Sequence, residues 1–228
     1  RIVVTATATP ILCNGGTSTV MVTASGATVP YTGEGTFTVV AGTHNYSVTD
    51  AIGCLGSTSI TVTEPTPIVV TITVTATPCV GGTGSVLVSA TGGTGAYTGT
   101  GTFTVSEGLV SYTVTDANGC TGSASTTIVA NPNPTATVAP TSLELCSDGS
   151  DSPSNLVVTT SETNIVWNDV LVTTGNTLAV SYLDGAFTYI ATITNSFGCT
   201  TQVSVPVTII SCASGITLTT KLFIEGYS

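Results

Sequence analysis

Apolar and polar residues alternate with a period of two along most of the chain. In the segment TSTVMVTASG, residues 17–26, the apolar residues Val20, Val22 and Ala24 fall on one face. Side chains of a β-strand point alternately to opposite faces, so this pattern predicts strands, and Gly-rich turns between them predict small β-sandwiches. No stretch has a helical period. The same alternation places further residues on common faces: Val86, Val88 and Ala90; Tyr46 and Val48; Ile60 and Val62.

A repeat of 66 residues organises the first half of the chain. The segment VTDAIGC at 48–54 recurs as VTDANGC at 114–120, and YTGEGTFTV at 31–39 recurs as YTGTGTFTV at 97–105 without a gap. Repeats with a fixed period indicate copies of one structural unit. The first 132 residues are therefore predicted to form two copies of one sandwich.

A third, more diverged unit follows. It contains Cys146 and Cys199, and its TITNSFGC at 192–199 mirrors the turn sequences of the first two units. The Pro-rich segments at 63–68 and 130–135 are short and stiff, because Pro fixes φ and restricts its neighbour. The predicted domains are 1–65, 66–132 and 133–212, with a terminal tail at 213–228.

Composition narrows the classes of function. The chain is 41% hydrophobic and only 6% charged, with a formal net charge of −10 and no Lys or Arg between residues 2 and 220. Binding to nucleic acid or to anionic membrane surfaces requires clustered cations, so both are excluded. No apolar run is long enough for a spanning helix, so membrane insertion is not expected. No signal peptide is present, so an exported protein would carry this sequence as its mature form or as an excised segment.

The segment CNGG…PYTGEGTFTVVAGTHNYSVTDAIGCLGSTSITVTEP resembles the SprB-type repeat of giant surface proteins of Bacteroidetes. The resemblance covers residues 1–132, while 133–212 is similar to a generic Ig-like domain. It implies three tandem Ig-like or PKD-like β-sandwich domains in an elongated array, at the bacterial cell surface, as in gliding adhesins. The tail LTTKLFIEGYS is similar to the start of a segment that often follows such repeats in exported proteins. The family motif is structural and implies no catalytic residues.

Two cysteines at constant positions in each unit indicate an oxidising compartment and disulfides. Zinc motifs place ligands in close pairs, whereas the closest cysteines here, Cys199 and Cys212, are 13 residues apart. We therefore expect no metal. The odd seventh cysteine, Cys212, is expected to be free or intermolecular. The favoured pairing closes each unit: Cys13–Cys54, Cys79–Cys120 and Cys146–Cys199.

An Ig-like strand order gives a second pairing. The turns that carry the two cysteines of a unit would then lie at opposite ends of its sandwich. Disulfides would join neighbouring domains, as Cys13–Cys120 and Cys79–Cys199. Cys54 and Cys146 would remain for neighbours along a polymer.

The polar candidates have ordinary explanations. His44 is the only histidine, and no G-x-S-x-G elbow accompanies it, so we expect a strand-edge residue and no catalytic site. Asp50 and Asp116 precede turns, where an Asp side chain bonds its own backbone. The loop ELCSDGSDS at 144–152 holds three acids that are a weak candidate for calcium, namely Glu144, Asp148 and Asp151.

Three aromatic residues are alternatives for carbohydrate binding. Trp167 lies between the cysteines of the third unit, and Tyr31 and Tyr97 precede Gly-rich turns. Packing in the core is the favoured role for all three. Exposed rings would instead make the chain a carbohydrate-binding module.

The two ends of the chain are candidates for assembly. An apolar strand with no partner templates pairing, so terminal strands are expected to complete a neighbouring subunit or to join adjoining domains of a longer chain. The expected function is non-enzymatic: an extracellular stalk or filament subunit that self-associates into a fibre. The candidate assembly residues are Ile2, Val4, Ile216, Leu218, Leu222 and Ile224.

Overall fold

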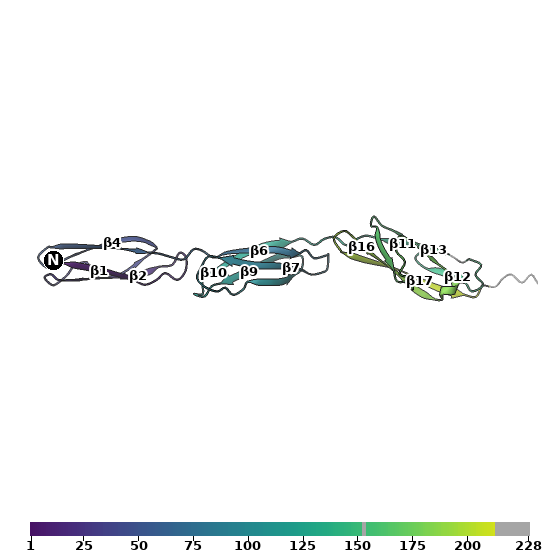
Figure 1. Ribbon diagram of the computed structural model, residues 1–228, viewed down its shortest axis with the longest axis horizontal. Helices are drawn as coiled ribbons and strands as arrows, with labels where there is room; N and C mark the ends of the chain where they lie inside the picture. The colour runs from purple at the N-terminus through teal and green to yellow at the C-terminus, as the bar shows by residue number, and fades with distance from the viewer. Residues whose placement is uncertain (152–153, 213–228) are drawn as a thin grey trace, which may run out of the picture. The chain divides into compact units, whose positions relative to one another are not determined.

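The computed structural model describes residues 1–151 and 154–212 (Figure 1). Its regular structure is β-strand apart from one 3-10 turn, Tyr182–Asp184, and the described residues contain no α-helix. The all-β fold class predicted from the alternation is confirmed. The chain divides into two compact units, Arg1–Ala130 and Asn131–Ser228.

The first half of the first unit is a small sandwich of five strands. Strands β1, β2 and β3 form one antiparallel sheet, and β4 and β5 form a hairpin. Strand β1 also lies close to β5, so the two sheets face each other. The buried core between them consists of Ile2, Ile11, Val20, Val22, Val48 and Val62. The bounds are β1 Val3–Ala8, β2 Ser18–Ser25, β3 Gly35–Val39, β4 Gly42–Thr49 and β5 Leu55–Val62.

The second half repeats this arrangement with its own core. Strands β6, β7 and β8 form the three-stranded sheet, β9 and β10 form the hairpin, and β6 lies close to β10. The buried residues are Val86, Val88, Val105, Val114 and Ile128. The bounds are β6 Val69–Ala76, β7 Gly84–Thr91, β8 Gly101–Val105, β9 Gly108–Thr115 and β10 Thr121–Ile128.

The second unit has the strand order of an Ig-like sandwich. One sheet has the order β11-β13-β15 and the other the order β12-β17-β16-β14. Strands β11, β13 and β15 correspond to strands A, B and E, and β17, β16 and β14 correspond to G, F and C, with β12 as an additional strand beside G. Strand β12 runs parallel to β17. The bounds are β11 Thr137–Ala139, β12 Leu143–Cys146, β13 Ser154–Thr159, β14 Asn164–Trp167, β15 Thr177–Val180, β16 Phe187–Thr194 and β17 Thr200–Ile210.

The buried faces predicted from the alternation are confirmed. The expectation that the first strand is free to assemble with a neighbour is wrong. Val20 and Val22 are fully buried, as are Val86 and Val88. Strand β1, however, is not free for assembly, because it pairs with β2 along its whole length. Ile2 is only 8% exposed and Val4 packs against the same core. The other candidate assembly residues, Ile216, Leu218, Leu222 and Ile224, lie outside the described residues.

Hydroxyl groups line the outer faces of the hairpins and sheets. Thr5 Oγ1 lies 2.8 Å from Thr23 Oγ1, and Thr43 Oγ1 lies 2.9 Å from Thr61 Oγ1. Each pair joins residues directly opposite one another on neighbouring strands. Such cross-strand pairs stabilise a sheet without ionic groups. They explain how a chain with 6% charged residues keeps a polar surface.

Candidate functional site: the cysteine-bearing turns

Three turns with the same hydrogen bonds carry one cysteine each. Each begins with Asp or Asn and ends on a cysteine four residues later: Asp50–Cys54, Asp116–Cys120 and Asn195–Cys199. Oδ1 of the first residue accepts hydrogen bonds of 2.7 to 3.1 Å from the N–H groups of the third and fifth residues. The N–H of the first residue donates to the cysteine carbonyl. We call these the Asx turns. The structural role predicted for Asp50 and Asp116 is confirmed.

The two aspartates of the Asx turns are buried but remain ionised. Asp50 is 7% exposed and Asp116 is 6% exposed. Burial acts to raise the pKa of each carboxyl. The backbone N–H groups that point at each carboxylate outweigh burial, so both pKa values lie below the ordinary 3.8. For Asp116 these donors include Thr94 as well as Cys120.

A second kind of turn carries the first cysteine of each repeat and of the second unit. In Cys13–Gly16, Cys79–Gly82 and Cys146–Gly149 the N–H of the last residue donates to the cysteine carbonyl at 3.0, 2.8 and 3.0 Å. We call these the CxxG turns. Gly15 and Gly81 have φ near +75°, a conformation that favours glycine. Each of the two repeats, and likewise the second unit, therefore presents one cysteine on a CxxG turn and one on an Asx turn.

A disulfide joins the two repeats of the first unit. Cys13, on the first CxxG turn, is bonded to Cys120, on the second Asx turn, with their Cα atoms 5.5 Å apart and a sequence separation of 107. Asn118 Nδ2 of the same Asx turn donates to Leu12 O at 3.4 Å. The bond thus connects the end of one sandwich to the beginning of the next.

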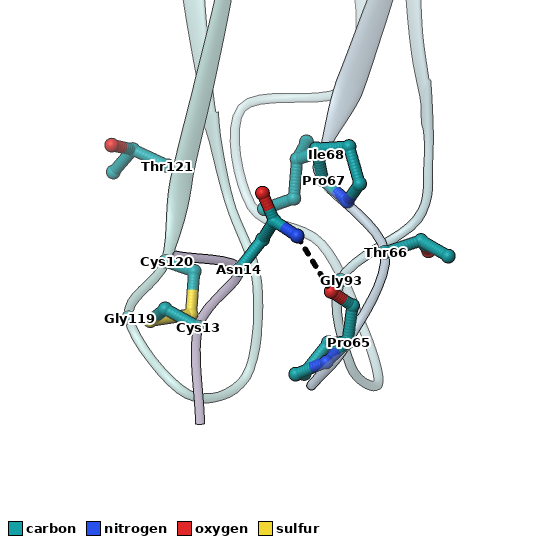
Figure 2. A pocket seen from close by; sticks show the side chains of 10 residues that line it. All are labelled: Cys13, Asn14, Pro65, Thr66, Pro67, Ile68, Gly93, Gly119, Cys120 and Thr121. Carbon is teal, nitrogen blue, oxygen red and sulfur yellow. Dashed lines mark hydrogen bonds between the residues drawn. A yellow bond between two sulfur atoms is a disulfide. The ribbon is translucent and has the colours of Figure 1, made fainter. Parts of the chain in front are cut away.

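The polypeptide linker forms the second connection at this joint. Asn14 Nδ2 donates to Pro65 O at 3.1 Å, and Gly15 N donates to Glu64 Oε2 at 2.6 Å. On the other side Gly93 N donates to Thr66 O at 2.8 Å. Figure 2 shows Asn14 directed at the linker while Cys13 and Cys120 meet beside it. A hollow of about 390 Å³ separates the disulfide from the linker.

The favoured pairings Cys13–Cys54 and Cys79–Cys120 are wrong. The alternative pairing of Cys13 with Cys120 is confirmed. Cys13 lies at the end of the sandwich where β5 runs into the linker, whereas Cys54 lies at the start of β5. Eight strand residues separate these ends by about 25 Å at roughly 3.3 Å per residue. A disulfide requires Cα atoms within about 7 Å. Cys54 is consequently exposed and free.

The expectations for Cys146 and Cys212 are also wrong. The parallel register of β12 and β17 places Cys146 beside Ile210, and Cys212 follows two residues later. The two cysteines are bonded, with Cα atoms 5.2 Å apart. Cys199 lies at the opposite end of the eleven-residue strand β17. Cys79 and Cys199 are also disulfide-bonded, and their predicted link to each other stays a prediction.

The other candidate residues have structural roles. His44 lies in β4, where Nε2 makes a hydrogen bond of 2.9 Å with Val40 O. In the weak calcium candidate, Asp151 Oδ1 accepts from Cys146 N and Asp148 Oδ1 from Ser150 N. Glu144 lies on β12. Within residues 1–151 and 154–212 no group of three or more His, Cys, Asp or Glu side chains is placed to hold a metal ion.

The three aromatic candidates for carbohydrate binding are packed, as favoured. Trp167 is 1% exposed, and its Nε1 donates to Gly175 O at 3.0 Å. Tyr31 and Tyr97 pack against the cores of their sandwiches. The hydroxyl of Tyr31 bonds Ala27, and that of Tyr97 donates to Gly92 O. None of these rings is an open platform for a sugar.

A hollow of about 780 Å³ in the second unit is lined by the loop after β14 and by Phe187 and Tyr189. Its polar side chains are bonded to the protein itself. Asp169 accepts from the backbone N–H and the hydroxyl of Thr173, and Asp184 accepts from Ser181 N. Asn168 bonds the backbone of β16 through both ends of its amide.

No protein-family model and no curated protein sequence matches the chain. Among solved structures it is similar to the N-terminal four Ig domains of Dscam1 isoform 6.9, with 11% identity, 91% of this chain and 73% of that chain covered, and a TM-score of 0.28. The same region of isoform 1.9 has 12% identity, coverages of 92% and 69%, and a TM-score of 0.27. Scores this low carry no argument, and the architecture rests on strand pairing alone.

The disulfides fit an oxidising compartment and hence an extracellular or secreted protein. No helix among residues 1–151 and 154–212 is long and apolar enough to cross a membrane. The cysteine-bearing turns and the disulfide-linked joint between the two repeats are the candidate functional features of this chain.

Proposed function

We propose that the chain is a non-enzymatic structural segment of a bacterial surface protein of the SprB-repeat type, acting as a stalk or filament subunit under tension. The single observation that carries this proposal is the Cys13–Cys120 disulfide, which joins two repeats in place of closing each one. A disulfide within a domain protects that domain alone. A disulfide between domains changes the path along which force passes through the chain.

The joint removes most of the first unit from the line of force. Tension applied at residues 1 and 130 passes along the chain to Cys13, crosses the disulfide to Cys120 and leaves the unit. The loop between the two cysteines, whose sequence separation is 107, bears no tension once the chain is taut. At about 3.4 Å per residue, unfolding of that loop would otherwise add about 360 Å of length.

The second unit contains its own disulfide that takes a loop out of the line of force. The Cys146–Cys212 disulfide encloses a loop of 66 residues that includes most of its strands. That loop would contribute about 220 Å if it unfolded without the disulfide, at about 3.4 Å per residue. Both disulfides also stabilise the folded state, by about 4 to 5 kcal/mol for loops of this size in the chain-entropy model.

Two connections at one joint also restrict bending and twisting. The linker hydrogen-bonds to both repeats through Glu64, Pro65 and Thr66, while the disulfide lies across the hollow from it. A joint fixed at two separate points turns only about the line between them. A stalk or filament needs this stiffness to hold its tip away from the cell surface.

Single-molecule force spectroscopy tests the proposal. The full chain is pulled by its ends with intact disulfides, after reduction, and as the double variant Cys13→Ser/Cys120→Ser. We expect the reduced chain to extend further than the oxidised chain by about 580 Å at about 3.4 Å per residue. The double variant should extend by a smaller amount, because its remaining disulfides stay closed. Equal extension of oxidised and reduced chains would refute the proposal.

Electron microscopy of the native source distinguishes the two forms of the proposal. Filaments with a regular subunit repeat would select a polymer of this chain. Isolated rods would select a segment of a longer stalk. Globular particles without either form would contradict both.

A further inference from the structure

Among the seven cysteines, only Cys54 is free, and it is exposed. It sits on an Asx turn whose hydrogen bonds match those around Cys120, including the bond of 2.7 Å from Cys54 N to Asp50 Oδ1. In the second repeat the same position is bonded to the CxxG turn of the preceding repeat. The first repeat therefore presents a cysteine at the same position and in the same backbone setting, without a disulfide partner.

The surface around Cys54 is more apolar than its counterpart at the joint. Ile52 is 71% exposed and Leu55 is 68% exposed. The corresponding residues of the second repeat are Asn118, which bonds Leu12 O, and Thr121, which lines the joint. In the joint within the chain, the Asx-turn end of the second repeat contacts a CxxG turn and is bonded to its cysteine.

The second unit also carries a CxxG turn, and the cysteine of this turn is bonded to a cysteine that has no counterpart in the two repeats. Gly149 N donates to Cys146 O at 3.0 Å, as Gly16 N does to Cys13 O. By position Cys146 corresponds to Cys13, but its partner is Cys212, which has no counterpart in the first two repeats. Cys146 and Cys212 are both partly exposed.

Charged residues lie at both ends: Asp50 and Arg1 at the Cys54 end, and acidic residues near Cys146. Arg1, the only cationic side chain of the first 220 residues, lies at the end of the first repeat beside Gly26, with its backbone N 3.3 Å from Gly26 O. The loop 26–28 in turn accepts a hydrogen bond from Ala51 of the Cys54 turn. Near Cys146 the chain carries Asp148 and Asp151, and Asp151 accepts a hydrogen bond from Cys146 N.

We propose that Cys54 of one copy displaces Cys212 from Cys146 of a second copy, so that copies join head to tail by disulfide exchange. This inference rests on the proposed function as a filament subunit. The Cys54 thiolate attacks Sγ of Cys146, the Cys54–Cys146 bond forms, and the Cys146–Cys212 bond breaks. The electron pair leaves with Cys212, which takes up the proton that Cys54 lost. No oxidant is consumed, and the number of free thiols stays at one per chain.

The resulting contact is heterologous, because it uses one end of the first unit and a turn of the second. Contacts of this kind that do not close into a ring generate open filaments. In this arrangement Cys212 protects Cys146 until a subunit arrives. The intramolecular disulfide keeps each chain a monomer with reactive ends.

The test uses the purified full chain, concentrated without oxidant under anaerobic conditions at low salt. We expect a ladder of dimers, trimers and longer species on non-reducing gels. Because residues 2–220 contain no Lys or Arg, the linked peptides are released with a protease that cleaves at acidic residues and identified by mass spectrometry. The expected products are a Cys54–Cys146 peptide and a free Cys212, with an unchanged thiol count.

The matched controls are Cys54→Ser, which removes the attacking thiol from an exposed turn, and Cys212→Ser, which removes the disulfide that is attacked. Neither should give a ladder, and Cys54→Ser should keep the melting temperature of the original chain. A ladder in Cys54→Ser, dimers linked only by Cys54–Cys54, or a loss of thiols as species grow would overturn the exchange. Absence of any ladder would also overturn the exchange. The proposed structural function would still be upheld if the oxidised single chain extends less under force than the reduced chain.

Discussion

Oδ1 of Asp116 accepts a hydrogen bond of 2.9 Å from the backbone N–H of Cys120, whose sulfur is bonded to Cys13. The carboxylate therefore fixes the turn from which the disulfide reaches the preceding repeat. Oδ2 of the same carboxylate accepts from Thr94 N at 2.8 Å, so that one side chain joins the two loops at this end of the sandwich.

The variants Asp116→Asn and Asp116→Ala should separate these two functions of the carboxylate. Asn keeps an acceptor for the Asx turn, as Asn195 does in the second unit, but presents an amide N–H₂ group to Thr94 N. Ala removes every acceptor and leaves buried donors without partners. We expect the melting temperature of the first unit to fall in the order original, Asn, Ala. Calorimetry of both variants, with the exposed Glu107→Gln as control, measures it. An Ala variant as stable as the Asn variant would contradict this role.

Acid should destabilise the first unit over a defined range of pH. The pKa values of Asp50 and Asp116 are lowered in the folded chain, because their backbone donors outweigh burial. A lowered pKa contributes stability that is complete above the unfolded value, about 3.9, and is lost as the pH falls through the folded value. We expect the melting temperature to be steady from pH 7 to 5 and to fall below about pH 4. The double variant Asp50→Asn/Asp116→Asn should have a shallower acid limb, and an unchanged limb would assign the acid sensitivity to other carboxyls.

Local features of the fold could be predicted from sequence because they depend on neighbours in the chain. The burial of Val20 and Val22 follows from alternation with period two, and the bonds of Asp50 follow from the chemistry of an Asp placed before a turn. Both depend on a few consecutive residues. The core position of Trp167 was likewise predictable, because an exposed indole was the less favourable alternative.

The disulfides could not be assigned from sequence because they depend on which turns share an end of a sandwich. Cys13 and Cys54 belong to one repeat and lie at opposite ends of it, whereas Cys13 and Cys120 belong to different repeats and meet. The bond of Cys212 depends on the parallel pairing of β12 with β17, which no local pattern encodes. The alternative derived from an Ig-like topology supplied the Cys13–Cys120 bond, but it left Cys146 for a neighbouring chain and did not pair it with Cys212.

Replacement of two tyrosines by phenylalanine should have opposite effects on stability. The hydroxyl of Tyr46 is buried with no hydrogen-bond partner, while its ring lies 4.9 Å from that of Phe37. Tyr46→Phe keeps the ring contact and removes the unpaired group, so the free energy of unfolding should rise by about 1 kcal/mol. Tyr31→Phe removes the bonds to Ala27 and should lower it by about 1 kcal/mol. Urea unfolding of both variants checks the signs, and a destabilised Tyr46→Phe would show that this hydroxyl is paired in solution.

Two glycines allow the first strand of each sandwich to approach the hairpin, and alanine at either should be destabilising. A Cβ on Gly56 would lie 2.5 Å from Cγ2 of Ile2, and one on Gly122 would lie 2.7 Å from the backbone O of Ile68. Overpacking of this kind costs about 1 to 3 kcal/mol. A side-chain methyl group can shift, whereas the carbonyl of Ile68, directly before β6, moves only with its backbone. We therefore expect Gly122→Ala to lose more stability than Gly56→Ala, and the exposed neighbour Ser57→Ala to lose almost none. Urea unfolding of the three variants measures this order, and a Gly56→Ala variant as stable as Ser57→Ala would show that β1 does not need this close approach.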